Sequence, residues 1–354
     1  MREVLYLSSL DPLSLSDLRI AASFLTPEDR LSFMGYDSGF EKASLEDRKG
    51  IAEILLSDLR ILAELDLRPS QIFSSLLFFR QLSDLEPLSF DTLLLPYVDL
   101  PVLLRLKGAE SLVSTKEVYL VANYDKMPDY LFDPLCLAPY VKGIIPNHIP
   151  CGKIRNGARL EITPEMGDYL IEKDLYFIPY LKGLMKPTRF LHAVSVAKTA
   201  YEIAIRNNLN PERAYQAGLF HDCGKDVPLT AQMKLLKDHF TEFLPLPEFA
   251  YHQFVGSYLA KSCFGIEDEE VLSAIRFHCT GKTDMSRMEK CIYAADKVEP
   301  TRQFPTEKGR EAVYQDLDSG FLVVLQEQEK YFAKIGINER EADLTDQMYR
   351  SLGL

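Results

Sequence analysis

Four histidines and two aspartates in the second half of this 354-residue chain have the types and spacing of ligands for a metal centre. Imidazole and carboxylate groups together suit borderline divalent metal ions. A helical bundle can direct such groups from separate helices into one cavity. The expected metal ligands are His192, His221, Asp222, His252, His278 and Asp296.

The adjacent pair His221-Asp222 limits the kind of metal site that the chain can form. Consecutive residues on a regular helix diverge by about 100°, so both can serve one site only if the backbone leaves the helix there. Gly224 permits that departure. A bridging carboxylate such as Asp222 can hold two metal ions about 3.5–4 Å apart, which activates a water and clamps a phosphoryl oxygen. We therefore expect a two-metal phosphohydrolase with Asp222 among its catalytic residues.

An isolated histidine beside apolar residues is more often an ordinary interior or surface residue than a ligand. His148 and His239 have no supporting context, and we expect neither to bind metal. The six cysteines contain no CxxC pair, so they predict neither a zinc knuckle nor a disulfide framework. The joint pattern of the other four histidines with the two aspartates is much harder to obtain by accident.

The charge of the chain limits its partners. A net charge of −12 argues against a long-range field that draws the protein onto nucleic acid or an anionic membrane. An anionic substrate must therefore be held by local cations. Lys225, three residues after Asp222, is the candidate for stabilising phosphoryl charge, with a solvated surface lysine as the alternative. Further candidate nucleotide contacts are Thr280, Gly281, Lys282, Lys297 and Arg302, whereas we expect Tyr293 to pack in the core.

The elements that must position these residues are helices. From Pro164 onward the pattern is almost unbroken helix. Asn210-Pro211-Glu212 is a typical helix start, and we expect this helix to run toward Gly224. The domain from 181 to 354 is expected to be all-α, with further helices over 248–264, 268–278, 286–298, 309–335 and 338–352.

Residues 1–180 alternate strand-like and helical patterns. Residues 2–8 look like a first strand, 18–24 have helical apolar spacing, and a longer helix follows a cap at Ser44. The segments "LSFDTLLLP" and "KEVYLVAN" resemble buried strands. This alternation predicts an α/β domain with a parallel sheet and crossover helices. The longest apolar stretches fall short of the roughly 20 residues that span a bilayer, and we expect a cytoplasmic protein.

Segments around the expected ligands resemble a known family. "RFLHAVSVAKTAYEIA", "AGLFHDCGKD" and residues 252–305 are similar to the HD phosphohydrolase superfamily and, within it, to the YqeK-type symmetrical diadenosine tetraphosphate hydrolases. The resemblance covers nearly all of 182–354. It implies two divalent metal ions, iron or alternatively manganese or another ion, and hydrolysis of the dinucleoside polyphosphate to two ADP. It places His192, His221, Asp222 and Asp296 around one metal, His252 and His278 around the other, and Asp222 between them. The resemblance does not decide whether the protein forms a homodimer.

A second resemblance covers the N-terminal half. "VLYLSSLDPLSLSDLRIAASFL" looks like the opening strand, loop and helix of nicotinate-nucleotide adenylyltransferases, with Asp11 and Pro12 matching. That family's two glycines are replaced by Leu7 and Ser8, although glycine lets a backbone approach phosphate oxygens closely. Its two histidines are replaced by Ser14 and Asp17.

The second signature of that family survives in part as "IPCGKIR", which keeps Arg155. We therefore expect a Rossmann-like, nucleotidyltransferase-type domain without adenylyltransferase activity, in which Arg155 is a surface or salt-bridge residue. Its role as a scaffold, a dimerisation surface or a nucleotide sensor stays open. The alternatives for the whole chain are a residual or bifunctional adenylyltransferase and a non-catalytic nucleotide-binding protein.

Overall fold

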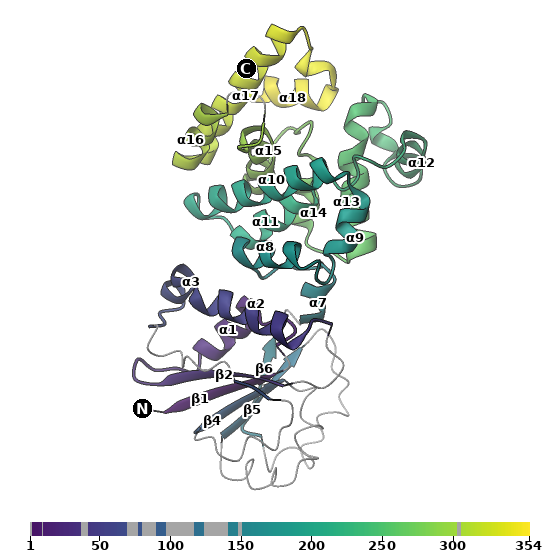
Figure 1. The fold of residues 1–354 in the computed structure, drawn as a ribbon. Coiled ribbons are helices and arrows are strands. Elements are labelled where there is room, and N and C mark those ends of the chain that lie inside the picture. Colours follow the sequence, from purple (N-terminus) through teal and green to yellow (C-terminus); the bar gives the residue numbers. More distant parts are fainter. Residues whose placement is uncertain are drawn as a thin grey trace. The chain divides into compact units, whose positions relative to one another are not determined.

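The computed structural model of the chain divides into two compact units (Figure 1). The first comprises Met1–Arg155 and Glu161–Tyr176, and the second Asn156–Leu160 and Phe177–Leu354. The structure describes residues 2–8, 10–36, 42–68, 77–79, 90–96, 117–123, 141–147, 151–302 and 306–354. Cys136, His148 and the Ile149-Pro150 start of the "IPCGKIR" motif lie outside the described residues.

The first unit is built on a parallel sheet of six strands in the order β3-β2-β1-β4-β5-β6. Every described strand pair is parallel, with Tyr6 of β1 between Phe33 of β2 and Leu94 of β4. This is the strand order of doubly wound nucleotide-binding sheets, and the α/β prediction is confirmed. The strands are β1 (Glu3–Ser8), β2 (Arg30–Tyr36), β3 (Leu77–Phe79), β4 (Thr92–Pro96), β5 (Glu117–Asn123) and β6 (Gly143–Asn147).

The first helix begins earlier than its apolar spacing predicts, at Leu15, because Ser14 and Asp17 form a capping box. The Ser14 hydroxyl accepts from the Asp17 N–H at 3.2 Å, and the Asp17 carboxylate accepts from the Ser14 N–H at 3.0 Å. The Tyr6 hydroxyl donates to the same carboxylate at 2.5 Å. The described helices of this unit are α1 (Leu15–Ala22), α2 (Leu45–Ser57), α3 (Leu59–Glu64), α7 (Cys151–Arg155) and α8 (Pro164–Glu172).

Replacing Ser14 with alanine should loosen α1 without changing the hydrolase reaction that we expect of the other unit. Loss of an N-cap costs about 1 kcal/mol, a factor of about five in local opening. Hydrogen exchange of peptides from α1 should accelerate by about that factor. Turnover measured on the same preparation should stay at the wild-type rate. A large fall in turnover would mean that the N-terminal domain takes part in catalysis.

The second unit is entirely helical in its described residues, as expected, and α10 packs against both α11 and α15 at its centre (Figure 1). None of the helices described in the chain is both long enough and apolar enough to cross a bilayer. The helices of this unit are α9 (Ile178–Leu184), α10 (Pro187–Arg206), α11 (Pro211–Phe220), α12 (Leu229–His239), α13 (Tyr251–Phe264), α14 (Glu269–Arg276), α15 (Arg287–Val298), α16 (Glu307–Gln315), α17 (Leu317–Ile335) and α18 (Asp343–Ser351).

The expected single helix over 309–335 is wrong. It is two helices, α16 and α17, separated at Asp316, whose backbone is extended (φ −157°, ψ 123°). The Asp316 carboxylate accepts from the Ser319 N–H at 2.8 Å, so this residue caps α17 instead of continuing α16. Gly320 then lets the two helices approach closely, because a Cβ there would lie 2.5 Å from the backbone of Ala312.

Candidate metal centre

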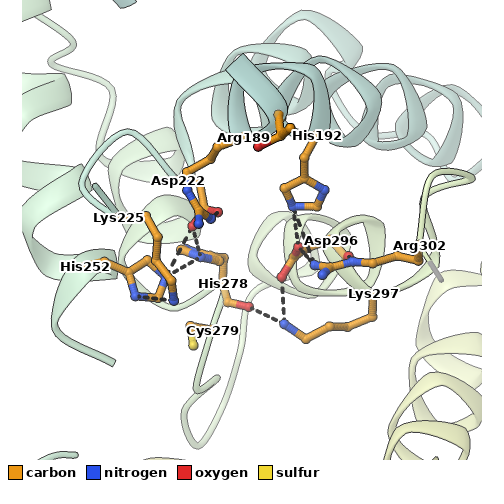
Figure 2. Close-up of a pocket in the computed structure, with 11 residues that line it drawn as sticks. Arg189, His192, Asp222, Lys225, His252, His278, Cys279, Asp296, Lys297 and Arg302 are labelled. Carbon is orange, nitrogen blue, oxygen red and sulfur yellow. Dashed lines mark hydrogen bonds and ion pairs between the residues drawn. The ribbon is translucent and has the colours of Figure 1, made fainter. Parts of the chain in front are cut away.

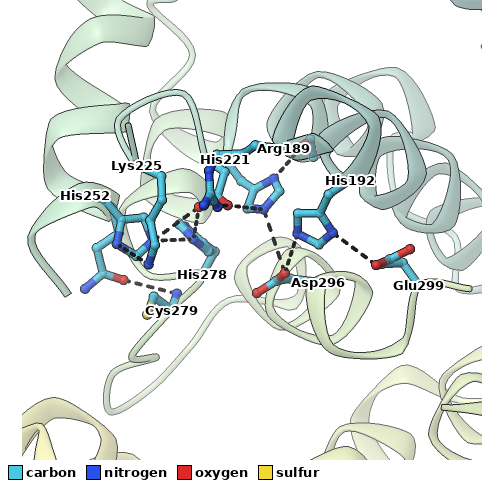
Figure 3. Close-up of polar contacts among 12 residues, drawn as sticks. Arg189, His192, His221, Lys225, His252, His278, Cys279, Asp296 and Glu299 are labelled. Carbon is cyan, nitrogen blue, oxygen red and sulfur yellow. Dashed lines mark hydrogen bonds and ion pairs between the residues drawn. The ribbon is translucent and has the colours of Figure 1, made fainter. Parts of the chain in front are cut away.

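The six expected ligands come together from five separate elements (Figures 2 and 3). Five of the six line a pocket of about 350 Å³. The sixth, His221, is fully buried beneath it, with its ring edge-on to the rings of His192 and His278. The contributing elements are α10 (His192), the turn after α11 (His221, Asp222), α13 (His252), the turn after α14 (His278) and α15 (Asp296).

The turn after α11 brings Asp222 to the pocket. The helix ends at Phe220, not at Gly224 as expected, and the following residues form turns. Gly224 has a different role: a Cβ there would lie 2.5 Å from the carbonyl oxygen of His252 and 2.5 Å from the backbone nitrogen of Gly256. Only glycine allows this turn to lie directly on the backbone of α13, which places Asp222 beside His252.

Three of the histidines are oriented in the same way. The Nδ1 atom of His221, His252 and His278 lies 2.7 Å from the backbone carbonyl oxygen three residues earlier in each case. A carbonyl oxygen only accepts, so Nδ1 carries the proton and the lone pair is on Nε2. This hydrogen bond is the usual support of a metal-ligating imidazole. The chain therefore presents three pre-oriented Nε2 donors to the centre.

Asp222 lies between two groups of nitrogen atoms. Its Oδ1 is 3.3 Å from Nε2 of His252 and 3.5 Å from Nε2 of His278, and its Oδ2 is 3.9 Å from Nε2 of His221. Potential ligand atoms within 4.8 Å of one another form three overlapping sets, two of which contain Asp222. The sets are His192-His221-Asp222, His221-His278-Asp296 and Asp222-His252-His278.

Two observations on the histidine nitrogens test whether these residues fit a metal ion. Nε2 of His221 is a buried polar atom without a hydrogen-bond partner. Nε2 of His252 and Nε2 of His278 face each other at 3.2 Å, although both rings use Nδ1 as the donor to a carbonyl. Buried polar atoms are normally paired. Coordination of a metal ion by these lone pairs would give each nitrogen the partner that it lacks, so the donor set fits a metal centre.

The two aspartates of the centre are held in the ionised form. Burial acts to raise the pKa of Asp222, but the neighbouring histidines His221, His252 and His278 lower it well below its usual range. Burial likewise acts to raise the pKa of Asp296, but Lys297 and Arg302 lower it well below the usual range. Ionised carboxylates are the form that coordinates divalent metals.

Glu299 is a site residue that the sequence analysis missed. Its Oε1 lies 3.0 Å from Nδ1 of His192, whose Nε2 lies 3.0 Å from Oδ1 of Asp296 (Figure 3). Burial acts to raise the pKa of Glu299, but hydrogen bonds from His192, Ser195 and Thr301 lower it to about 2. A buried carboxylate behind a histidine orients the ring and raises its basicity. The sequence signal was the spacing of three between Asp296, near the end of α15, and Glu299, the residue that follows this helix.

The metal affinity of the centre should rise with pH because of His192. Burial acts to lower the pKa of this ring, but Asp296 and Glu299 raise it to about 9. Coordination through Nε2 needs the neutral ring, so metal binding must release this proton. We expect affinity to increase by about tenfold per pH unit from about pH 7 to about pH 9 and to level off above. Metal titrations at several pH values measure this, and a flat profile would exclude His192 as a ligand.

Cations surround the pocket. Arg189, which the sequence analysis also missed, donates to Oδ2 of Asp222 at 2.6 Å from a position one turn before His192 on α10. Nζ of Lys225 lies 3.1 Å from Nδ1 of His252, at the edge of the pocket (Figure 2). On the other side, Arg302 donates to Oδ1 of Asp296, and Lys297 donates to Oδ2 of that residue at 2.7 Å.

Three of the expected nucleotide contacts do not line this pocket. Nζ of Lys282 lies 3.2 Å from Oε1 of Glu289. Thr280 is fully buried, and its hydroxyl oxygen accepts from the Gln253 amide at 3.0 Å. Gly281 has a positive φ of 65°, and a Cβ there would meet the sulfur of Met348. Thr280 and Gly281 therefore shape the turn that carries His278.

In the N-terminal unit, the motif residues Asp11 and Arg155 bind each other. Nη1 of Arg155 donates to the Asp11 carboxylate at 3.0 Å, the Tyr176 hydroxyl donates to it at 2.8 Å, and the Lys42 N–H donates at 2.8 Å. The Ala43 N–H is also within 3.3 Å, and Asp11 is 1% exposed. Its oxygens are thus occupied by donors from the protein itself.

Comparison with known proteins places the match in the C-terminal half. The HD domain family model matches residues 189–301. A Bacillus subtilis protein named bis(5'-nucleosyl)-tetraphosphatase, symmetrical, is 37% identical over 134 residues, which are 35% of this chain and 68% of the relative. A protein of the same name from Halalkalibacterium halodurans is 36% identical over 137 residues, 38% of this chain and 73% of the relative.

The chain is also similar to a further relative and to a solved structure. A Mycoplasma genitalium protein named "Probable nicotinate-nucleotide adenylyltransferase/Ap4A hydrolase" is 32% identical over 160 residues, and the match covers 45% of each chain, less than half of that relative. The solved structure of a "predicted HD superfamily hydrolase involved in NAD metabolism" from Clostridium acetobutylicum is similar with a TM-score of 0.44 and 32% identity, over 49% of this chain and 93% of that one.

Proposed function

The chain belongs to the HD family of phosphohydrolases that includes the symmetrical bis(5'-nucleosyl)-tetraphosphatases, and from this premise we propose that its C-terminal domain hydrolyses diadenosine tetraphosphate to two ADP. The observation that supports the proposal is the position of Asp222 in two overlapping sets of ligand atoms. One carboxylate shared by two sets is the arrangement that two-metal phosphohydrolases require.

We propose that the six ligands hold two divalent ions, with iron as the first candidate and manganese or another ion as the alternative. His192, His221, Asp222 and Asp296 surround one ion in this assignment, and His252 and His278, with Asp222, surround the other. Such ions supply Lewis acidity toward a phosphoryl oxygen and activate water near neutral pH.

The protein's own cations hold the polyphosphate. The substrate carries several negative charges, and Lys225, Lys297 and Arg302 line the pocket beside the ligands. Lys297 and Arg302 also bind Asp296, so they orient this carboxylate while presenting positive charge to the substrate. In the described part of the chain, Nζ of Lys225 contacts the ring of His252 and no carboxylate, so this lysine is the strongest candidate for stabilising charge on the reacting phosphoryl group.

The proposed reaction consumes one water. Its oxygen forms a bond to one of the two central phosphorus atoms, and the bond from that phosphorus to the central bridging oxygen breaks. The bridging oxygen leaves with the other half of the substrate, so each half becomes ADP. The proton from water passes to solvent or to a basic side chain at the pocket edge.

We propose that the N-terminal domain does not catalyse adenylyl transfer. Asp11 and Arg155, the motif residues that it retains, are engaged with each other, and the positions of the family's histidines carry the Ser14-Asp17 capping box. An assay with nicotinate mononucleotide and ATP tests this proposal, and formation of the dinucleotide would overturn it.

The deciding experiment for the C-terminal domain is turnover of diadenosine tetraphosphate by the full chain loaded with ferrous iron or manganese. Chromatography should show two ADP per substrate, with activity lost on chelation and restored by metal. Release of AMP and ATP would contradict symmetrical cleavage. Binding of the substrate with no ADP released would instead support a non-catalytic nucleotide-binding protein.

A further inference from the structure

A second pocket adjoins the metal pocket. It has a volume of about 250 Å³, and Cys279 and Lys297 line both pockets. Lys297 reaches both: its Nζ donates to Asp296 at 2.7 Å and lies 4.8 Å from the centre of the Tyr293 ring. Tyr293 lines only the second pocket of the two. A ligand held at the metal centre can therefore extend past Lys297 into this second pocket.

The walls of the second pocket include large apolar side chains, some of which are exposed. Eight large hydrophobic side chains are exposed in the described part of the chain, and two of them, Phe249 at 46% and Ile337 at 51%, line this pocket. Phe332 of α17 also lines it. Exposed aromatic and aliphatic side chains that gather beside an ion-binding site offer stacking surface to a ligand whose other end is charged.

Two side-chain amides are among the polar groups of the pocket, which also include Lys297, Glu341 and Thr345. Gln328 of α17 and Asn338, which follows that helix, both line it. Oε1 of Gln328 accepts from the Tyr293 hydroxyl at 3.3 Å, which turns the amide NH2 group away from that ring. An amide NH2 donates to ring nitrogens of a purine, and an amide oxygen accepts from an exocyclic amine. The pocket thus combines stacking surface with groups that can recognise the edge of a base.

We propose that this second pocket binds one nucleoside of the dinucleoside polyphosphate, with Lys297 between the base and the phosphates. The assignment rests on the proposed function of the neighbouring metal centre. Pockets that enclose drug-sized ligands have volumes of about 300–1,000 Å³, so about 250 Å³ suits one nucleoside and not the whole substrate. The second nucleoside then lies outside this pocket.

Binding of ADP and of inorganic pyrophosphate to the metal-loaded full chain tests the assignment. Phe249→Ala removes the aromatic wall but keeps the backbone carbonyl that orients His252. We expect this variant to weaken ADP binding by about tenfold and to leave pyrophosphate binding unchanged. Isothermal titration calorimetry measures both affinities.

Ile337 and Ile335 form a matched pair. They are 51% and 48% exposed, two residues apart, and only Ile337 lines the pocket. We expect Ile337→Ala to weaken ADP binding and Ile335→Ala to leave it at the wild-type value. The pair controls for a general loss of stability, because each substitution replaces an exposed isoleucine with alanine and only one of the two isoleucines lines the pocket.

The outcomes separate this inference from the proposed function. Equal weakening of ADP and pyrophosphate by Phe249→Ala would assign the residue to the metal centre and overturn the nucleoside pocket, as would unchanged ADP binding. A different result would separate the two proposals. If the wild-type chain releases no ADP from diadenosine tetraphosphate, the proposed reaction fails. If ADP affinity nevertheless falls in the Phe249 and Ile337 variants and not in the Ile335 variant, the nucleoside pocket is supported.

Discussion

Replacing Asp222 with asparagine should lower turnover by on the order of 10³-fold or more and reduce the bound metal. The Asp222 carboxylate lies near both sets of histidine nitrogens, at 3.3 Å from His252 and 3.9 Å from His221. Asparagine keeps the volume but removes the charge and one of the two oxygens, so it cannot serve both sides. Metal content by mass spectrometry and ADP release by chromatography measure the two effects.

Asp226→Asn is the matched control for that substitution. Asp226 binds the same arginine, with Oδ2 3.1 Å from Nε of Arg189, but it does not line the pocket. We expect its replacement to leave turnover close to the wild-type rate. The helical circular dichroism of both variants should match the wild type. Full activity of Asp222→Asn would contradict the assignment of this residue as the shared ligand.

Replacing Glu299 with glutamine should weaken metal binding by about 10- to 100-fold, the loss typical of a carboxylate behind a metal-ligating histidine. Glu299 is buried and accepts from Nδ1 of His192 at 3.0 Å. Glutamine is neutral and presents an NH2 group, so it supports the required orientation and basicity of the ring less well. Metal titration measures the affinity directly and does not depend on turnover.

Ser195→Ala separates the charge of Glu299 from its surroundings. The Ser195 hydroxyl donates to Oε2 of Glu299 at 2.6 Å, so its loss leaves the carboxylate and its bond to His192 in place. We expect only a small loss of metal affinity. Comparable losses in both variants would mean that packing around Glu299, not its charge, supports the centre. Wild-type affinity in Glu299→Gln would remove it from the metal site.

Much of the architecture followed from local pattern. Alternating strand and helix signals predicted the α/β class of the first half, and continuous helical periodicity predicted the all-α second half. The predicted helix boundaries were less accurate where a capping side chain sets the start of a helix. Ser14 caps α1, which therefore begins earlier than predicted, and Asp316 caps α17, which divides the expected long helix in two. A cap depends on one or two hydrogen bonds from a side chain, which apolar periodicity does not record.

The sequence by itself determined which residue types could make a metal centre, because histidine and aspartate are the ligands and their order matches a known pattern. Only the tertiary structure decided how they meet: that Asp222 faces two groups of imidazoles, that Arg189 and Glu299 belong to the site, and that Lys282 does not line the pocket. The physical reason is that coordination and charge pairing act over a few ångströms between residues up to about a hundred positions apart. Helix packing sets those distances, and spacing along the chain does not.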